Sequence, residues 1–180
     1  LVGSEMCIRD SYNPTNENYD GVIYMPCLSQ NNFVPELPKE EPDLIYLCFP
    51  NNPTGAIMTK EDLEPIAKLV EKYDLYVLSD EIYSELTYKT EHVSIASLPG
   101  MRERTLVVNG FSKGLAMTGW RLGYICGPQI IMEQMVKIHQ YAILCAPTNS
   151  QYAAIEGLKN CDDEIQKMRT ASVSYTHLTP

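Results

Sequence analysis

Polar side chains capable of acid–base, covalent and anion-binding chemistry follow three short apolar runs in the sequence. A lysine amine can bond to a carbonyl carbon, and a planar guanidinium can bind phosphate through two parallel hydrogen bonds. No metal-ligand set and no Ser/His/Asp set can be assembled from the same positions. The six candidate site residues are Asn52, Asp80, Tyr83, Ser112, Lys113 and Arg121.

The three runs, residues 44–49, 75–79 and 105–109, are apolar on both faces and are bounded by turn or polar residues. This pattern predicts parallel strands that are covered by helices on both sides. Residues 21–25 and 122–126 are two further predicted strands. Because ligands of open α/β sheets bind beyond the carboxyl ends of the strands, we expect the candidate residues to meet along one sheet edge.

Apolar residues recur at helical spacing between the first two runs, from Leu63 to Tyr73, and predict a crossover helix. Either Thr59 or Asp62 can cap its start. We favour Asp62, because Pro65 then falls in the first turn, where its missing N–H costs little.

Two more helices are predicted after the last strand. Residues 128–142 form one, and the other follows Thr148-Asn149 with Ala153, Ala154 and Leu158 on one face. The alternation of strands and helices predicts an α/β fold with a mostly parallel sheet and helices on both faces.

The composition is that of a globular domain with a buried core: 44% of the 180 residues are hydrophobic and 21% are charged. Fourteen Lys and Arg against 23 Asp and Glu give a formal net charge of -9, which disfavours nucleic acid and anionic lipid as partners. No apolar run approaches the ~18 residues of a membrane span. We therefore expect a cytoplasmic protein, and we interpret its six scattered cysteines as reduced thiols rather than zinc ligands or disulfides.

The two ends of the chain differ from the rest. Residues 1–11 and 171–180 show no helical or strand period and no capping or turn chemistry. Both strings resemble translated adapter sequence, so we interpret them as non-native read-through and residues 12–170 as the native part. We expect this native part to be an internal fragment of a longer protein.

Three other conspicuous residues carry no predicted chemistry. His92 lies in a polar loop and His139 on a predicted helix, each without convergent partners in the sequence, so we expect structural or surface roles for both. Trp120 is expected to pack beside the anion site.

Four short motifs occur in one order: Asn52-Pro53-Thr54-Gly55, Asp80 with Tyr83, Ser112-Lys113, and the run from Met117 through Arg121 to Gly123. Together they resemble the pyridoxal-phosphate core of the class I/II aminotransferases, which are fold type I enzymes, over about residues 43–158. The resemblance implies a pyridoxal 5'-phosphate cofactor. It also implies that residues 12–170 are part of the cofactor-binding large domain of that fold.

The resemblance also implies a role for each candidate. Lys113 would form the Schiff base with the cofactor and move a proton between the substrate Cα and the cofactor. Asp80 would face the pyridine nitrogen and favour its protonated form, and Asn52 and Tyr83 would donate hydrogen bonds to the ring oxygen.

Arg121 would clamp the cofactor phosphate. Many relatives have a serine at the place of Gly110, so part of that contact is expected to pass to Ser112 or to backbone N–H groups. To bring Arg121 beside Lys113, the strand 122–126 should run antiparallel to its neighbours.

The implied activity is amino transfer between an L-amino acid and a 2-oxo acid. Residues 110–127, with 137–141 and 145–148, are similar to aspartate, aromatic or alanine aminotransferases of the prokaryotic subgroup, which makes an aspartate-type substrate the leading expectation. Residues 24–27, 32–38 and 47–52 look more like LL-diaminopimelate aminotransferases, so a chimeric assembly joined near the Asn-Pro-Thr-Gly turn stays open. The sequence also leaves two further functions open: a carbon–sulfur β-lyase on the same fold and a non-catalytic binding domain.

The resemblance further implies a homodimeric full-length protein. Its substrate-closing arm, glycine-containing phosphate loop, ring-stacking aromatic residue and substrate-binding arginine cannot be placed in this chain. We therefore expect the isolated chain to be inactive.

Overall fold

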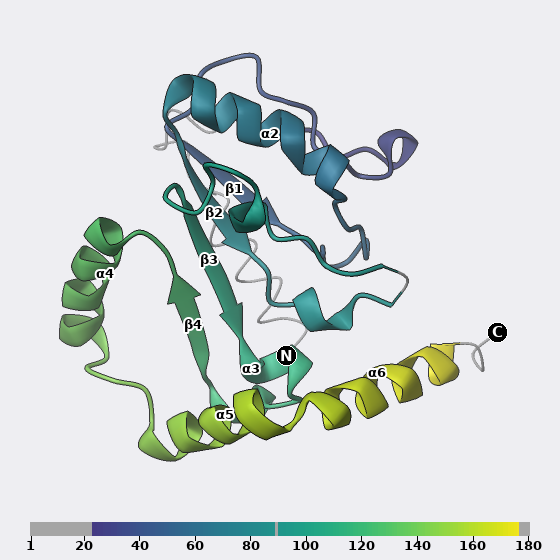
Figure 1. Cartoon of the computed structure of the whole chain (residues 1–180), viewed down its shortest axis with the longest axis vertical. Coiled ribbons are helices and arrows are strands. Elements are labelled where there is room, and N and C mark those ends of the chain that lie inside the picture. The colour runs from purple at the N-terminus through teal and green to yellow at the C-terminus, as the bar shows by residue number, and fades with distance from the viewer. Residues whose placement is uncertain (1–22, 89, 177–180) are drawn as a thin grey trace.

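A four-stranded sheet forms the centre of the computed structural model, which describes residues 23–88 and 90–176 (Figure 1). Strands β1 (Leu44–Cys48), β2 (Tyr76–Asp80) and β3 (Thr105–Gly110) are parallel, and β4 (Gly123–Cys126) pairs antiparallel with β3. The three parallel strands, the α/β architecture and the antiparallel direction of the last strand are confirmed.

Helix α2 (Lys60–Tyr73) makes the crossover from β1 to β2, and it begins earlier than predicted. Thr59 is its N-cap: its hydroxyl accepts from the N–H of Asp62 at 3.2 Å, and the Asp62 carboxylate accepts from the N–H of Thr59 at 2.8 Å. The prediction that Asp62 caps the helix is therefore wrong. The reciprocal pair satisfies two N–H groups, whereas Pro65, inside the helix, leaves only the carbonyl of exposed Glu61 without its helical partner.

The main core lies between one face of the sheet and α2. Alternate strand residues such as Ile45 and Val77 are buried there against Ile66 and Val70 of the helix, together with Met101 from the loop before β3. Burying each such side chain contributes about 1.5–3 kcal/mol to folding. The opposite face of β1 and β2 carries the half-buried residues that line the cleft described below.

The remaining helices follow the strands β3 and β4: α3 (Phe111–Gly114), α4 (Gln129–Ala142), α5 (Thr148–Asn160) and α6 (Asp162–Thr176). A second, smaller core joins Phe111, Met117 and Ala154. The predicted face of α5 is partly wrong, because Leu158 is 63% exposed. Gly157 faces the core in its place, since a Cβ there would lie 2.6 Å from a methyl of Leu115.

Two other sequence predictions are corrected by the structure. Residues 23–25 form no strand, and residues 21–22 lie outside the described residues. Pro26 follows this segment directly, and β1 is the edge strand of the described sheet, with no further strand beside it. Helix α6 continues to Thr176, so residues 171–176 are helical despite their weak periodicity. The interpretation of both chain ends as non-native stays a prediction, and residues 1–11 lie outside the described residues.

Among the described helices, none is both long enough and apolar enough to cross a bilayer.

Candidate active site

A cleft of about 1090 Å³ runs along β1 and reaches the carboxyl ends of the three parallel strands. The turn after β1, the segment after β2, helix α3 and the loop before β4 all contribute to its lining. The structure brings all six candidates into this lining: Asn52, Asp80, Tyr83, Ser112, Lys113 and Arg121. Their predicted meeting at one sheet edge is thus observed, and the role of each stays a prediction.

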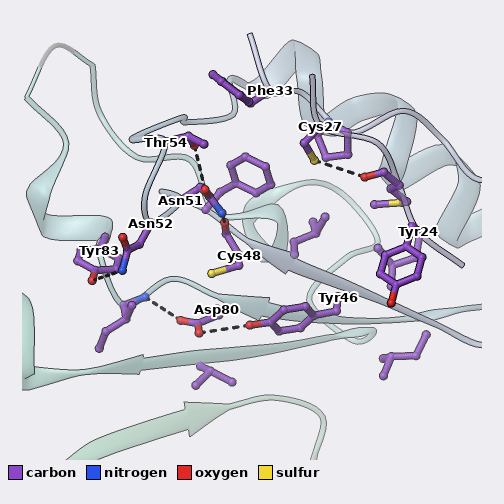
Figure 2. A pocket seen from close by; sticks show the side chains of 18 of the residues that line it. Tyr24, Cys27, Phe33, Tyr46, Cys48, Asn51, Asn52, Thr54, Asp80 and Tyr83 are labelled. Carbon is purple, nitrogen blue, oxygen red and sulfur yellow. Dashed lines mark hydrogen bonds between the residues drawn. The ribbon is translucent and has the colours of Figure 1, made fainter. Parts of the chain in front are cut away.

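Asn52 and Tyr83 lie side by side, as Figure 2 shows, although they come from the turn after β1 and the segment after β2. The Asn52 side-chain amide donates to the Tyr83 hydroxyl at 3.4 Å. Burial raises the pKa of the Tyr83 phenol, and the hydrogen bond from Asn52 opposes that shift. The phenol is therefore a hydrogen-bond donor at neutral pH, placed where a ring oxygen could accept from it.

Asp80 ends β2 with its side chain on the cleft face (Figure 2). Its Oδ1 accepts from the N–H of Ile82 at 3.2 Å, and its Oδ2 accepts from the Tyr46 hydroxyl at 3.4 Å. Burial raises the pKa of the Asp80 carboxyl, and these two hydrogen bonds oppose the shift. A cationic group bound beside Asp80 would also favour the ionised carboxylate.

Lys113 is presented by α3, which starts directly after β3. Its Nζ lies 5.4 Å from the centroid of the Tyr83 ring. Burial lowers the pKa of the Lys113 amine, which raises the fraction of the neutral, nucleophilic form. Gly110 allows this close assembly, because a Cβ there would lie 3.2 Å from the Cα of Gly123 and 3.1 Å from the Ile82 side chain.

Arg121 reaches the cleft from the loop before β4, with a left-handed backbone conformation at φ 51°. Its guanidinium donates to the carbonyl of Thr118 at 3.3 Å, and the Thr118 hydroxyl donates to the carbonyl of Ser112 at 3.1 Å. Through these two bonds, Thr118 links Arg121 to Ser112, the two residues predicted to bind an anion. Trp120 is 43% exposed, so the prediction that it packs beside this loop is not confirmed.

A buried polar cluster that was not predicted from the sequence lies on the other face of β2. Glu81, 4% exposed, accepts from the Ser79 hydroxyl at 2.9 Å, from the Ser94 hydroxyl at 2.7 Å, and pairs with His92 Nε2 at 2.7 Å. The prediction that His92 lacks a convergent partner is therefore wrong. Ser79 and Glu81 alternate with Asp80, which could have indicated that their side chains point to the face opposite the cleft. Two partners of Glu81, His92 and Ser94, come from a loop eleven and thirteen residues away, which the local sequence does not indicate. We refer to Glu81, Ser79, Ser94 and His92 together as the Glu81 cluster.

The family model for aminotransferase class I and II matches residues 21–176. This chain belongs to the class I and II aminotransferase family. The Bacillus subtilis protein YugH is 54% identical over 130 residues, covering 72% of this chain and 34% of that protein. An aspartate aminotransferase of Pyrococcus abyssi is 46% identical, covering 77% of this chain and 37% of the relative. The chain thus spans about a third of the length of the curated relatives it matches.

Solved aminotransferase structures share the fold. A mutant of the Thermus thermophilus aspartate aminotransferase superposes with a TM-score of 0.74 at 35% identity, covering 82% of this chain and 40% of that one. The aromatic aminotransferase from Pyrococcus horikoshii gives a TM-score of 0.69 at 48% identity, covering 72% of this chain and 35% of that one. The predicted fold family is confirmed.

Aminotransferases of this family use pyridoxal phosphate, and the residues of the cleft fit that group. The cleft offers a carboxylate for a ring nitrogen, an adjacent amide and phenol for a ring oxygen, and an amine for the aldehyde carbon. Arg121 and Ser112, joined through Thr118, would hold the phosphate.

Proposed function

We propose that this chain is the cofactor-binding part of an aminotransferase that moves an amino group between an L-amino acid of the aspartate type and a 2-oxo acid. The observation that carries the proposal is the convergence in one cleft of Lys113 from α3 with Asp80 and Tyr83 from the end of β2 and the segment after it. The aspartate aminotransferases among the relatives support the substrate class.

Each of these residues has a distinct task in amino transfer. When bound, pyridoxal phosphate supplies an electron sink for the bond that breaks at the substrate Cα. The Lys113 amine holds the cofactor and then carries the proton away from that carbon. The Asp80 carboxylate keeps a proton on the ring nitrogen, and Asn52 with Tyr83 orients the ring through its oxygen.

A diaminopimelate-type substrate is the second candidate. A Bacillus subtilis relative named for N-acetyl-LL-diaminopimelate is 46% identical over 125 residues. The N-succinyldiaminopimelate aminotransferase from Mycobacterium tuberculosis superposes with a TM-score of 0.70 at 28% identity. The cleft continues past Tyr24 and Phe33 toward Glu40 and Glu41, which offers room for a long substrate with a distal amine.

The test uses the full-length protein that contains this chain. Borohydride reduction followed by peptide mapping is expected to find the pyridoxyl group on Lys113, and Lys113→Ala should abolish both the label and amino transfer. Lys68→Ala, on the exposed side of α2, is the matched control and should retain both. Transfer from aspartate to 2-oxoglutarate supports the first candidate, and transfer only from an N-acyl diaminopimelate supports the second. Release of pyruvate and ammonia without an acceptor would instead identify a β-lyase.

We also propose a homodimer for the full-length protein. Exposed apolar side chains on α4, including Ile130, Ile138 and Tyr141, support burial of this helix against further protein.

A further inference from the structure

The two carboxylate oxygens of Asp80 have separate hydrogen-bond donors (Figure 2). Oδ1 accepts from a backbone N–H, that of Ile82, whereas Oδ2 accepts from a side chain, the Tyr46 hydroxyl. An ionised carboxylate has only acceptors, and a protonated one must donate from one oxygen. The two donors together favour the ionised form of Asp80, against the opposing effect of burial.

The register of the sheet explains how Tyr46 reaches Asp80. Cys48 of β1 is the direct partner of Asp80, and Tyr46 is the partner of Leu78. Side chains two residues apart on a strand lie on the same face of the sheet. The two pairs therefore share one face, and Tyr46 and Asp80 are diagonal neighbours on adjacent strands. Diagonal pairs are within reach of a long aromatic side chain, and the hydroxyl at the end of the ring makes the contact.

We propose that Tyr46 is a positioning residue for the cofactor: its hydroxyl fixes the Asp80 carboxylate in its ionised form and in the orientation that faces the pyridine nitrogen. This inference rests on the proposed function, because it assumes that Asp80 faces that nitrogen. Phenylalanine would fill the space of the Tyr46 ring, so the hydroxyl is the part of the side chain that the role requires.

The groups around Asp80 act on its ionised form in both directions. Tyr46 and Cys48 face it from β1, Tyr83 lies beyond the end of β2, and Lys113 comes from α3. Burial raises the pKa of Asp80, adjacent Glu81 adds to that shift, and the hydrogen bonds from Ile82 and Tyr46 lower the pKa. Loss of the Tyr46 hydroxyl would remove one of the two donors that favour the ionised form.

The experiment compares wild type, Tyr46→Phe and Tyr76→Phe in the full-length protein reconstituted with pyridoxal phosphate that carries ¹⁵N in the ring. Tyr76 begins β2 at the end away from Asp80, so its variant is the matched control. The ¹⁵N chemical shift reports ring protonation. In Tyr46→Phe we expect a shift toward the unprotonated ring and a fall in kcat of about three- to tenfold with little change in KM. Tyr76→Phe should match wild type in both.

A double-mutant cycle with Asp80→Asn supplies a second readout. If Tyr46 acts through Asp80, Tyr46→Phe should have little effect in the Asp80→Asn background. An unchanged ¹⁵N shift in Tyr46→Phe, or additive effects in the cycle, overturns the inference alone. Absence of a borohydride-stable pyridoxyl group from Lys113 in wild type overturns the proposed function, and this inference with it.

Discussion

Two carboxylates occupy adjacent positions at the end of β2 and have opposite surroundings. Glu81 is enclosed by the Glu81 cluster, with hydrogen-bond partners at both oxygens and no open volume for a ligand of cofactor size. Asp80 lies in the large cleft, whose lining also holds the Tyr83 phenol and the Lys113 amine, and burial shifts the pKa of all three groups. A closed network of this kind stabilises the fold, whereas a half-buried carboxylate at an open cleft is available to bind a charged ligand.

The comparison predicts that Asp80→Asn has the largest effect on activity and little effect on stability. Removal of the negative charge beside the ring nitrogen should lower kcat/KM by about 100-fold or more. The free energy of unfolding should change little, because burial already disfavours the charged form of Asp80. Steady-state kinetics and urea unfolding measure the two quantities. Asp163→Asn, at the start of α6, is the control. If Asp80→Asn lowered the free energy of unfolding by several kcal/mol, the contrast between a ligand-binding Asp80 and a stabilising Glu81 would be contradicted.

Glu81→Ala is expected to have the converse effect. It removes three hydrogen-bonded contacts and leaves Ser79, Ser94 and His92 without their shared partner, which should lower the free energy of unfolding by about 3 kcal/mol. Urea unfolding measures this loss, and the exposed Glu64→Ala on α2 should change it by no more than about 0.5 kcal/mol. The visible spectrum of the bound cofactor should be retained. Wild-type stability in Glu81→Ala would show that the Glu81 cluster contributes nothing net.

The smallest effect concerns the pH dependence of cofactor capture by Lys113. The neutral amine attacks the aldehyde, so the rate should rise with pH as the amine loses its proton. Burial lowers the pKa of Lys113, and the midpoint of this rise should therefore lie below the ordinary value of 10.5. Stopped-flow absorbance of the apoprotein mixed with pyridoxal phosphate measures the rate. The reference is Nα-acetyl-lysine, whose free side-chain amine has the ordinary pKa of about 10.4. An equal or higher midpoint for the protein would contradict the prediction.

Much of the architecture follows from local sequence. Runs that are apolar on both faces predicted β1, β2 and β3, because a doubly covered parallel strand has no polar side. The parallel direction then placed Asn52, Asp80 and Lys113 at the same sheet edge, since each stands at or just after the end of a strand. The predicted cap of α2 is wrong because the reciprocal hydrogen bonds between Thr59 and Asp62 outweigh the cost of a proline inside the helix.

The sequence by itself determined which residues could do chemistry and that strand ends would gather them, because both follow from residue type and short-range periodicity. Only the tertiary structure decided which carboxylate faces the cleft and which is enclosed. The pairs Tyr46 with Asp80 and His92 with Glu81 join residues 34 and 11 positions apart. Such contacts depend on strand register and on the path of a loop across the sheet, which are set by the packing of the whole domain rather than by any local pattern.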